Sequence, residues 1–213
     1  MTRLILIIVV VSYLLGSIPF GYLLVRIFCG QDVRKSGSGN IGATNVARIG
    51  SKGLGVATLF LDALKGYAAV WIAHTLIVQS AQPSVIPMVG ELADVVMALA
   101  GLTAIVGHMY PFWLRFKGGK GVATAAGAFA ALAPRAMLFA LIAFALVVAL
   151  TRYVSLGSIV AAVCFPVSFY LTASPARTNM LVALLTSISS LLIIIRHKDN
   201  IRRLLAGTEN RFR

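Results

Sequence analysis

Residues 35–48 combine glycines, short polar side chains and one arginine in a pattern that suits phosphate binding. Because glycine adopts positive φ readily, Gly37, Gly39 and Gly42 can direct several backbone N–H groups towards one anion. The planar guanidinium of Arg48 can bind phosphate through two parallel hydrogen bonds. A glycine- and serine-rich turn followed by a helix cap would have the same composition, so this segment alone leaves both interpretations open. The side-chain donors expected here are Ser38, Asn40, Thr44 and Asn45.

A second segment, residues 107–124, places a lysine among glycines. Because Lys120 has no bulky neighbours, a phosphate can approach its amine closely, whereas Lys117 and Arg115 are better explained as lipid-facing or topological charges. The segment is not a P-loop, because the Gly-x-x-x-x-Gly-Lys-Ser/Thr pattern is absent. Its aromatic residues fit a belt at the membrane interface. The glycines expected to help bind phosphate are Gly118, Gly119 and Gly121.

The third segment, residues 196–209, carries a histidine and an asparagine at helical spacing. His197 and Asn200 are three residues apart, so on a helix their side chains share one face. A basic helix that lies on anionic lipid would explain the arginines of this segment. It would not explain a His-x-x-Asn pair at the membrane boundary, which makes the pair a candidate for function.

Polar residues inside apolar segments are costly to bury and therefore informative. Asp62 and Lys65 are three residues apart and can form a pair, for which we expect a role in helix packing. Ser155 and Ser158 follow a short turn near the same side of the membrane as the glycine-rich segments. Ser158 could add a hydroxyl to an anion site, although a serine near a helix end needs no special role.

Several common catalytic arrangements are missing from the sequence. There is no Gly-x-Ser-x-Gly elbow, and the three histidines are not accompanied by a nucleophile and an acid. No carboxylate cluster is present that could hold Mg²⁺. We therefore expect no metal and no cofactor, and a site that stabilises developing negative charge with fixed donors.

The composition is typical of an integral membrane protein. Of 213 residues, 59% are hydrophobic and 12% are charged, against about 25% charged residues in a soluble domain. The 19 Lys and Arg residues exceed the 6 Asp and Glu residues and lie mainly between apolar segments, which favours topology and anionic lipid or phosphate over nucleic acid. The apolar segment from Leu4 to Cys29 is too long for a removable signal peptide. Cys29 and Cys164 both lie in apolar segments, which argues against a disulfide or a metal site.

The apolar segments predict an all-α integral membrane fold with seven transmembrane helices in a single domain, residues 1–213. A span needs about 20 apolar residues. Two candidates, 122–133 and 136–150, are shorter, so they are tilted, re-entrant or parts of one interrupted span. The other candidates are 4–29, 54–79, 92–111, 154–173 and 180–195.

The distribution of charge favours seven crossings. Merging residues 122–150 into one span would put Arg152 and the cationic tail opposite the two glycine-rich loops. With seven spans, 14 cations share one side and three lie on the other. The positive-inside rule then places the amino terminus outside and the carboxyl terminus, with the functional loops, in the cytoplasm. The 14 are Arg34, Lys35, Arg48, Lys52, Arg115, Lys117, Lys120, Arg152, Arg196, Lys198, Arg202, Arg203, Arg211 and Arg213; the three are Arg3, Arg135 and Arg177.

Together, the three polar segments closely resemble the bacterial acyl-phosphate:glycerol-3-phosphate acyltransferase family. The resemblance covers nearly the whole chain, because the motifs at 37–48, 107–124 and 196–209 occur in the family's order. It implies a seven-helix enzyme of the bacterial inner membrane, active in phospholipid biosynthesis. Such an enzyme moves a fatty acyl group from acyl phosphate to the 1-hydroxyl of glycerol 3-phosphate, giving lysophosphatidic acid and phosphate. The stretch at 79–91, rich in proline and small residues, is longer than the family's shorter members require.

The resemblance also implies roles for individual residues. Glu209 matches a further motif position. The residues assigned to substrate binding or catalysis are Ser38, Arg48, Lys120, Ser158, His197 and Asn200.

The chemistry agrees with this assignment. Acyl phosphate already carries a good leaving group, so holding two phosphates and one hydroxyl in register would supply much of the rate enhancement. We expect Lys120, Arg48 and the glycine loops to neutralise the phosphates, and Ser38 with the amides of residues 40–45 to orient the acyl phosphate. Glycerol 3-phosphate would be positioned by Ser158, His197 and Asn200. The hydroxyl proton would pass to His197 or to a substrate phosphate oxygen.

Three other functions compete with this one: a carrier, an acyl-CoA-dependent acyltransferase and a purely structural membrane protein. A transporter of organic phosphates or a lipid flippase would also use cationic loops and the intramembrane residues Asp62 and Lys65, but the chain has no evident inverted repeat. An acyl-CoA-dependent acyltransferase would be expected to carry a His-x-x-x-x-Asp pair, which is absent. The sequence does not indicate an oligomeric state.

Overall fold

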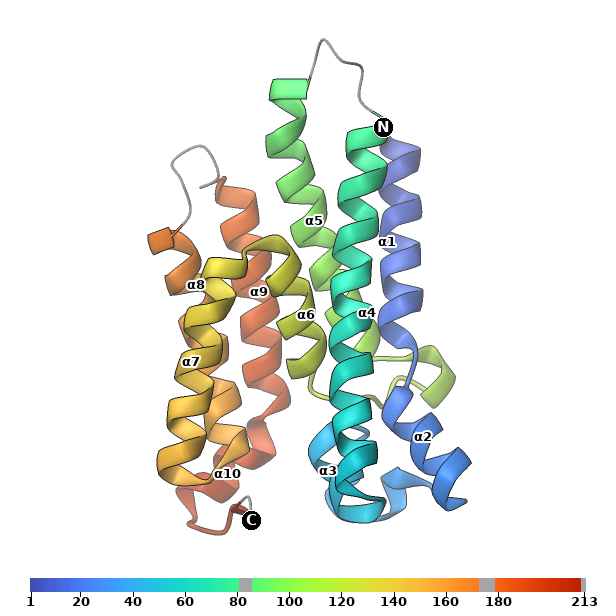
Figure 1. The fold of residues 1–213 in the computed structure, drawn as a ribbon, viewed down its shortest axis with the longest axis vertical. Coiled ribbons are helices and arrows are strands. Elements are labelled where there is room, and N and C mark those ends of the chain that lie inside the picture. Colours follow the sequence, from blue (N-terminus) through green and yellow to red (C-terminus); the bar gives the residue numbers. More distant parts are fainter. Residues whose placement is uncertain (81–85, 173–178, 212–213) are drawn as a thin grey trace.

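The computed structural model describes residues 1–80, 86–172 and 179–211, and every regular element in these ranges is a helix (Figure 1). The prediction of an all-α fold therefore holds throughout the described residues. The stretch at 79–91 and the span at 154–173 lie partly outside these ranges. Two cations of the charge pattern, Arg177 and Arg213, also lie outside them.

The first apolar segment forms two helices instead of one. Helix α1 (Thr2–Ser17) ends before Ile18, and α2 (Phe20–Cys29) begins after Pro19. Proline has no N–H group and disfavours helical backbone in the residue before it, so the helix breaks at this point. After α2, a 3₁₀ turn (Val33–Lys35) and the glycine-rich loop lead into the short helix α3 (Ala43–Ile49).

The remaining helices form the body of the molecule (Figure 1). Five helical segments of the described residues, with α1 and α2 counted as one, are long and apolar enough to cross a membrane. They become six if α9 and α10, which are bent by 56°, form one span. The helices are α4 (Lys52–Gln79), α5 (Ile86–Met109), α6 (Val122–Leu132), α7 (Pro134–Thr151), α8 (Val154–Thr172), α9 (Met180–Arg196) and α10 (Lys198–Leu205).

One of the two expected short spans is longer than predicted. Helix α6 has only 11 residues, as the segment at 122–133 indicated, but α7 has 18 residues and begins at Pro134. Proline is favoured in the first turn of a helix, and Arg135 can extend its charged end towards the membrane surface, so both residues belong to the helix. The expectation of a second short span was therefore wrong, while the count of seven crossings remains a prediction.

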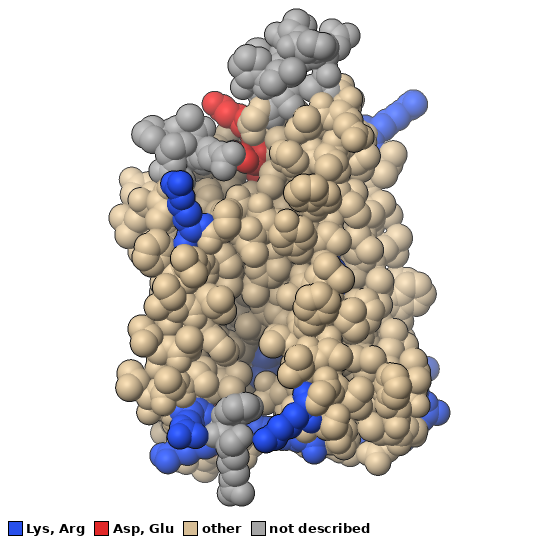
Figure 2. Space-filling model, in the orientation of Figure 1, with Lys and Arg blue, Asp and Glu red and all other residues tan. Residues whose placement is uncertain are grey.

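Lysine and arginine residues gather at one end of the molecule. Figure 2 shows them concentrated at the end where α2 and α10 lie, with few at the opposite end and a broad band of uncharged residues between. This is the separation that the charge pattern predicted for the two membrane faces. Which end faces the cytoplasm remains a prediction.

Glycines bring α4 and α6 into close contact. A Cβ atom on Gly66 would lie 2.0 Å from the carbonyl oxygen of Thr124, and one on Gly127 would lie 1.8 Å from the main chain of α4. Small residues allow helices in membranes to approach this closely. The start of α6, which follows Lys120, is thereby fixed against the part of α4 that carries Asp62.

The main apolar core lies beside this contact. It joins residues of every helix from α4 to α9, and the rings of Phe129 and Phe165 stack with their centroids 3.8 Å apart. Stacked aromatic pairs of this kind add to the stability that burial provides. The core therefore holds α6 and α9, which carry site residues at their ends, in fixed positions.

Candidate active site

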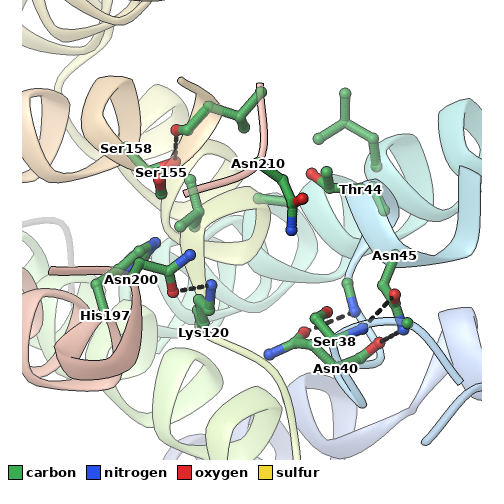
Figure 3. Close-up of a pocket in the computed structure, with 18 of the residues that line it drawn as sticks. Ser38, Asn40, Thr44, Asn45, Lys120, Ser155, Ser158, His197, Asn200 and Asn210 are labelled. Atoms are coloured by element: carbon green, nitrogen blue, oxygen red, sulfur yellow. Dashed lines mark hydrogen bonds between the residues drawn. The ribbon is translucent and has the colours of Figure 1, made fainter. Parts of the chain in front are cut away.

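A cavity of about 550 Å³ opens near the cationic end of the molecule. Figure 2 shows a hollow in this region with Lys or Arg atoms visible inside it. In Figure 3, the glycine-rich loop lies on one side of the cavity, and Lys120, His197 and Asn200 lie on the other. All six residues to which the resemblance assigned roles line this one cavity: Ser38, Arg48, Lys120, Ser158, His197 and Asn200.

Asn45 organises the glycine-rich loop. Its Oδ1 accepts a hydrogen bond from Ser38 N at 3.0 Å. Its Nδ2 donates to the carbonyl oxygens of Val33, Ser36 and Asn40 at 3.2, 3.2 and 2.9 Å. Only 2% of Asn45 is exposed. Because a buried amide bonded in this way holds three parts of the loop together, Asn45 fixes the conformation of the whole turn.

These bonds use the Asn45 amide within the loop, so Asn45 holds Ser38 N in place. Asn45 also lines the cavity, and its expected contact with a substrate stays a prediction. Gly37 is required beside the Asn45 side chain: it has φ +60°, and a Cβ atom there would lie 2.2 Å from Asn45 Oδ1. A third residue of the loop, Gly39, does not line the cavity, and its N–H group donates to Ser36 O at 3.1 Å.

The other polar residues of this loop face the cavity. Asn40 Oδ1 accepts a hydrogen bond from Gly42 N at 2.8 Å, which leaves the Nδ2 group of Asn40 as the donor. Thr44 and Arg48 lie on α3 with exposed side chains and line the same cavity. This wall therefore offers one guanidinium and several neutral donors, a combination suited to phosphate.

Lys120 lies directly before α6 on the opposite wall. Gly121 caps the helix with φ +80°, a conformation that favours glycine. The Lys120 amine donates a hydrogen bond to Asn200 Oδ1. Burial lowers the pKa of Lys120 to about 8, although the carboxylate of Glu209 opposes the shift. The amine is therefore mainly cationic at neutral pH, and it lies beside the unpaired N–H groups of the first turn of α6.

The two glycines before Lys120 lie away from the cavity lining. Gly118 and Gly119 are not among the residues that line it. Their N–H groups donate to the carbonyl oxygens of Met109 and His108, both at 3.1 Å. Because these amides are already paired, the structure does not bring them to the expected phosphate site.

Glu209 connects three elements at the back of the site. Its Oε1 accepts hydrogen bonds from Ser155 Oγ and Asn200 Nδ2, both at 2.7 Å, and its Oε2 accepts one from Arg203 Nε at 2.6 Å. Burial opposes ionisation, but these three hydrogen bonds outweigh it and hold the pKa of Glu209 below its ordinary value. The carboxylate thus fixes the orientation of Asn200, whose other amide atom meets Lys120.

His197 follows α9 and is 2% exposed. Its Nδ1 lies 2.8 Å from the carbonyl oxygen of Ile193, so this nitrogen carries the proton and Nε2 is the acceptor. Burial, together with the charge of Lys120, lowers the pKa of His197 to about 4. Ser158, on α8, donates its hydroxyl hydrogen to Val154 O at 2.8 Å and so presents only oxygen lone pairs to the cavity.

The sequence did not place every cavity residue. Asp62 and His108 line the cavity, although Asp62 was assigned only to packing. Arg203, which the sequence assigned to anionic lipid, and Asn210, which follows the third segment, also line it. For Asp62, the sequence did contain a signal: an acidic residue is costly to bury inside an apolar segment and therefore usually has a partner there.

Metal-ligating side chains are scattered through the described ranges. Within residues 1–80, 86–172 and 179–211, no three or more His, Cys, Asp and Glu side chains are grouped so that they could hold a metal ion. Cys29 and Cys164 are both free thiols. The chemistry of the cavity is that of fixed cations and hydrogen-bond donors, which can bind phosphate and stabilise developing negative charge.

Known proteins share this sequence and fold. A family model described as glycerol-3-phosphate acyltransferase matches residues 6–207. The chain is 48% identical over 202 residues to the glycerol-3-phosphate acyltransferase of Syntrophotalea carbinolica, which covers 95% of this chain and 94% of the relative. It is 49% identical over 203 residues to the enzyme of the same description from Mesorhizobium japonicum, which covers 95% and 93%.

Two solved structures also resemble this one. Both are crystal structures of PlsY, described as an integral membrane glycerol 3-phosphate acyltransferase. The glycerol 3-phosphate form has a TM-score of 0.85 at 39% identity and covers 98% of this chain and 96% of that one. The lysophosphatidic acid form has a TM-score of 0.81 at 38% identity, with 98% and 95% covered.

The fold and the site define an all-helical, multi-pass integral membrane protein with a cation-lined cavity near one end of its helices, as predicted. The match over residues 6–207 and the identity to the relatives make the family plain. The chain belongs to the glycerol-3-phosphate acyltransferase family.

Proposed function

We propose that this chain transfers a fatty acyl group from acyl phosphate to the 1-hydroxyl of glycerol 3-phosphate, forming lysophosphatidic acid and phosphate. The observation that carries the proposal is that Arg48 and Lys120, from distant parts of the sequence, line one cavity with Ser38, His197 and Asn200. Membership of the family supports the acceptor, and the lysophosphatidic acid form of the related PlsY supports the product. We expect the whole chain to act as one domain.

The two walls of the cavity suit two anionic reactants. Lys120 and Arg48 would neutralise the phosphates, and Ser38 with Asn40 would orient the acyl phosphate. Leu59, Val122 and Phe144 add apolar surface, which fits a fatty acyl chain better than a water-soluble donor. Glycerol 3-phosphate would lie near the wall that carries Ser158 and Asn200.

In the proposed reaction the 1-hydroxyl oxygen attacks the acyl carbonyl carbon, the carbonyl–phosphate C–O bond breaks, and phosphate leaves. No covalent enzyme intermediate is needed, because the leaving group is already good. We infer that the hydroxyl proton passes to a substrate phosphate oxygen. His197 is a weak base with a pKa of about 4, whereas a phosphate monoester has its second pKa at about 6. His197 would instead position the acceptor.

We further propose that the protein lies in the bacterial inner membrane with its amino terminus outside and its cavity at the cytoplasmic face. The concentration of cations at the cavity end supports this orientation (Figure 2). It gives the site access to a soluble acceptor on one side and to lipid on the other.

Purified protein in liposomes tests the proposal against a carrier. Enzyme activity predicts that phosphate and lysophosphatidic acid appear in equal amounts, and only when acyl phosphate and glycerol 3-phosphate are both present. Movement of glycerol 3-phosphate across the bilayer without product would instead identify a transporter. The assay is run without divalent ions and again with Mg²⁺, and the proposal predicts equal rates.

A further inference from the structure

Three ionisable side chains that the proposed reaction does not use are buried together, and two of them, Asp62 and His108, line the cavity. Asp62 Oδ1 lies 2.8 Å from Lys65 Nζ and 3.5 Å from His108 Nδ1, and each side chain is at most 4% exposed. Lys65 Nζ also donates to the carbonyl oxygen of Ile18 at 2.8 Å. The cluster therefore joins α4, α5 and the end of α1. Charges buried inside a membrane protein are costly unless they are paired, so this arrangement is expected to be maintained.

The imidazole of His108 packs directly against the segment that carries Lys120. A Cβ atom on Gly119 would lie 2.0 Å from His108 Nε2 and 2.9 Å from two ring carbons. Gly119 N donates to His108 O at 3.1 Å, and Gly119 O accepts from Arg196 Nε at 3.1 Å. Gly119 is thus held between a ring and a guanidinium, and the next residue is Lys120.

We propose that Asp62 and His108 are positioning residues for Lys120. The Asp62 carboxylate holds the His108 ring through a polar contact of 3.5 Å that is not a hydrogen bond. The ring determines the position of Gly119, and Gly119 determines where the Lys120 amine meets a substrate phosphate. The inference rests on the proposed function, in which that amine binds phosphate. Positioning matters because a displacement of about 1 Å at a reacting group can cost about 100-fold in rate.

A purely structural role is the alternative, in which the cluster only ties three helices together. The charged groups that face His108 are Asp62, Lys65 and Arg196. In a structural role, loss of Asp62 would lower thermal stability but leave Lys120 unchanged in the folded protein. In a positioning role, Lys120 itself changes.

A double-mutant cycle tests the contact between the ring and Gly119. Gly119 is not among the described glycines with positive φ, so Gly119→Ala is opposed by the ring and not by the backbone conformation. We expect Gly119→Ala to lower kcat about 100-fold in the natural chain. In a His108→Ala background, where the ring is absent, the same substitution should change kcat by no more than about twofold.

Gly101→Ala is the matched control in the same helix as His108. Its Cβ atom would contact Ala128 at 3.3 Å and Val70 at 3.4 Å, and no atom of His108. Its effect should therefore be equal in the two backgrounds. If Gly119→Ala costs as much without the ring as with it, the proposed contact does not position this segment and the inference is overturned.

Chemical labelling of lysines provides a readout that does not depend on acyl transfer. Asp62→Asn keeps the size of the side chain, so we expect the variant to fold. The folded variant can then be labelled with acetic anhydride and analysed by mass spectrometry. We expect the labelling rate of Lys120 to rise several-fold, while that of the exposed Lys117 stays constant. An unchanged labelling rate at Lys120 would overturn the inference. If Gly119→Ala does not fold, this labelling experiment alone tests the inference. A natural chain without acyltransferase activity would contradict the proposed function and leave this test intact.

Discussion

Lys120 donates a hydrogen bond to Asn200 Oδ1 although 80 positions separate the two residues in the sequence. The bond joins the start of α6 to α10, and Asn200 Nδ2 continues it to Glu209 at 2.7 Å. A cation, an amide and a carboxylate therefore form one chain of hydrogen bonds beside the cavity. A phosphate that enters the cavity meets an amine whose position is already fixed, which is the condition for electrostatic stabilisation without reorganisation.

Removal of the Lys120 amine should impair catalysis more than the loss of an ordinary lysine would. We expect Lys120→Met to lower kcat/KM by about 100- to 1,000-fold, because one fixed donor to a developing charge is lost. The control is Lys117→Met, which removes an exposed lysine that does not line the cavity and should leave kcat/KM within about twofold. Steady-state rates of both variants provide the measurement, and equal losses would contradict a specific role for Lys120.

The pH dependence of the reaction should report the pKa of Lys120. Burial lowers this pKa to about 8 from an ordinary value of 10.5, and only the cationic form binds phosphate well. As pH rises through about 8, the free protein loses the charge, so kcat/KM should fall about tenfold per pH unit above that point. The alkaline fall of kcat, which reports the substrate complex, should lie at higher pH, because bound phosphate stabilises the cationic form of Lys120.

Lys120→Arg is the control for this titration. Arginine remains cationic across the accessible range, so the alkaline limb of kcat/KM should disappear even if the rate is lower. A limb near pH 8 that persists in this variant would assign the titration to another group.

Loss of the Asn45 amide should disturb the conformation of the glycine-rich loop. Asn45→Ala leaves Ser38 N and several carbonyl oxygens unpaired, which costs about 1–3 kcal/mol for a buried group. We expect a raised KM for acyl phosphate and a lower thermal midpoint. Asn179→Ala is the comparison, because it removes a helix cap bonded to Leu181 N, worth about 1 kcal/mol, away from the cavity.

The two asparagine variants should therefore differ in kinetics and not in stability alone. Asn179→Ala should lower the midpoint and leave the KM for acyl phosphate unchanged. An equal KM in both variants would show that Asn45 does not organise a binding loop.

Glu209→Gln should weaken the tie between α8, α10 and the tail. The neutral amide keeps the size of the side chain but replaces one accepting oxygen with an NH₂ group. That group faces at least one of the side chains that donate to the carboxylate, which are Ser155, Asn200 and Arg203. Charge-assisted hydrogen bonds contribute about 1.5–3 kcal/mol, so the thermal midpoint should fall clearly. The exposed Glu91 provides the control, and Glu91→Gln should leave the midpoint unchanged.

The same variant tests the linkage of Glu209 to pH. Its pKa is held below the ordinary value of 4.5, so the stability it contributes is present above that pH and is lost as pH falls through the lower, folded-state pKa. The natural chain should lose stability in that acidic range faster than Glu209→Gln. Parallel curves for the two proteins would contradict the linkage.

The site residues could be predicted because their types are unusual for an apolar chain. A lysine among glycines and a His-x-x-Asn pair at a membrane boundary have few structural explanations, and the structure brings Lys120, His197 and Asn200 to one cavity. The break at Pro19 and the start of α7 at Pro134 were missed by the predicted spans 4–29 and 136–150, although both follow from local backbone rules. The helical fold could also be predicted, because apolar segments of this length form helices in a membrane.

What the sequence could not predict depends on contacts between distant residues. The Asn45 amide is used inside its own loop only because Val33 and Ser36 fold back onto it. The amides of Gly118 and Gly119 are paired because the chain returns to the end of α5. Glycine-rich composition indicates where backbone N–H groups can be exposed, but not which of them find a partner.

Exchange of labelled inorganic phosphate into acyl phosphate, measured with purified protein in the absence of glycerol 3-phosphate, tests direct transfer between two reactants held in one cavity. In direct transfer the acyl–phosphate bond breaks only when the acceptor hydroxyl attacks, and the acyl group is never attached to the protein. Direct transfer therefore predicts no exchange without the acceptor, and turnover when the acceptor is added. Exchange at a rate comparable to turnover would reveal a covalent acyl-protein intermediate and contradict the central claim.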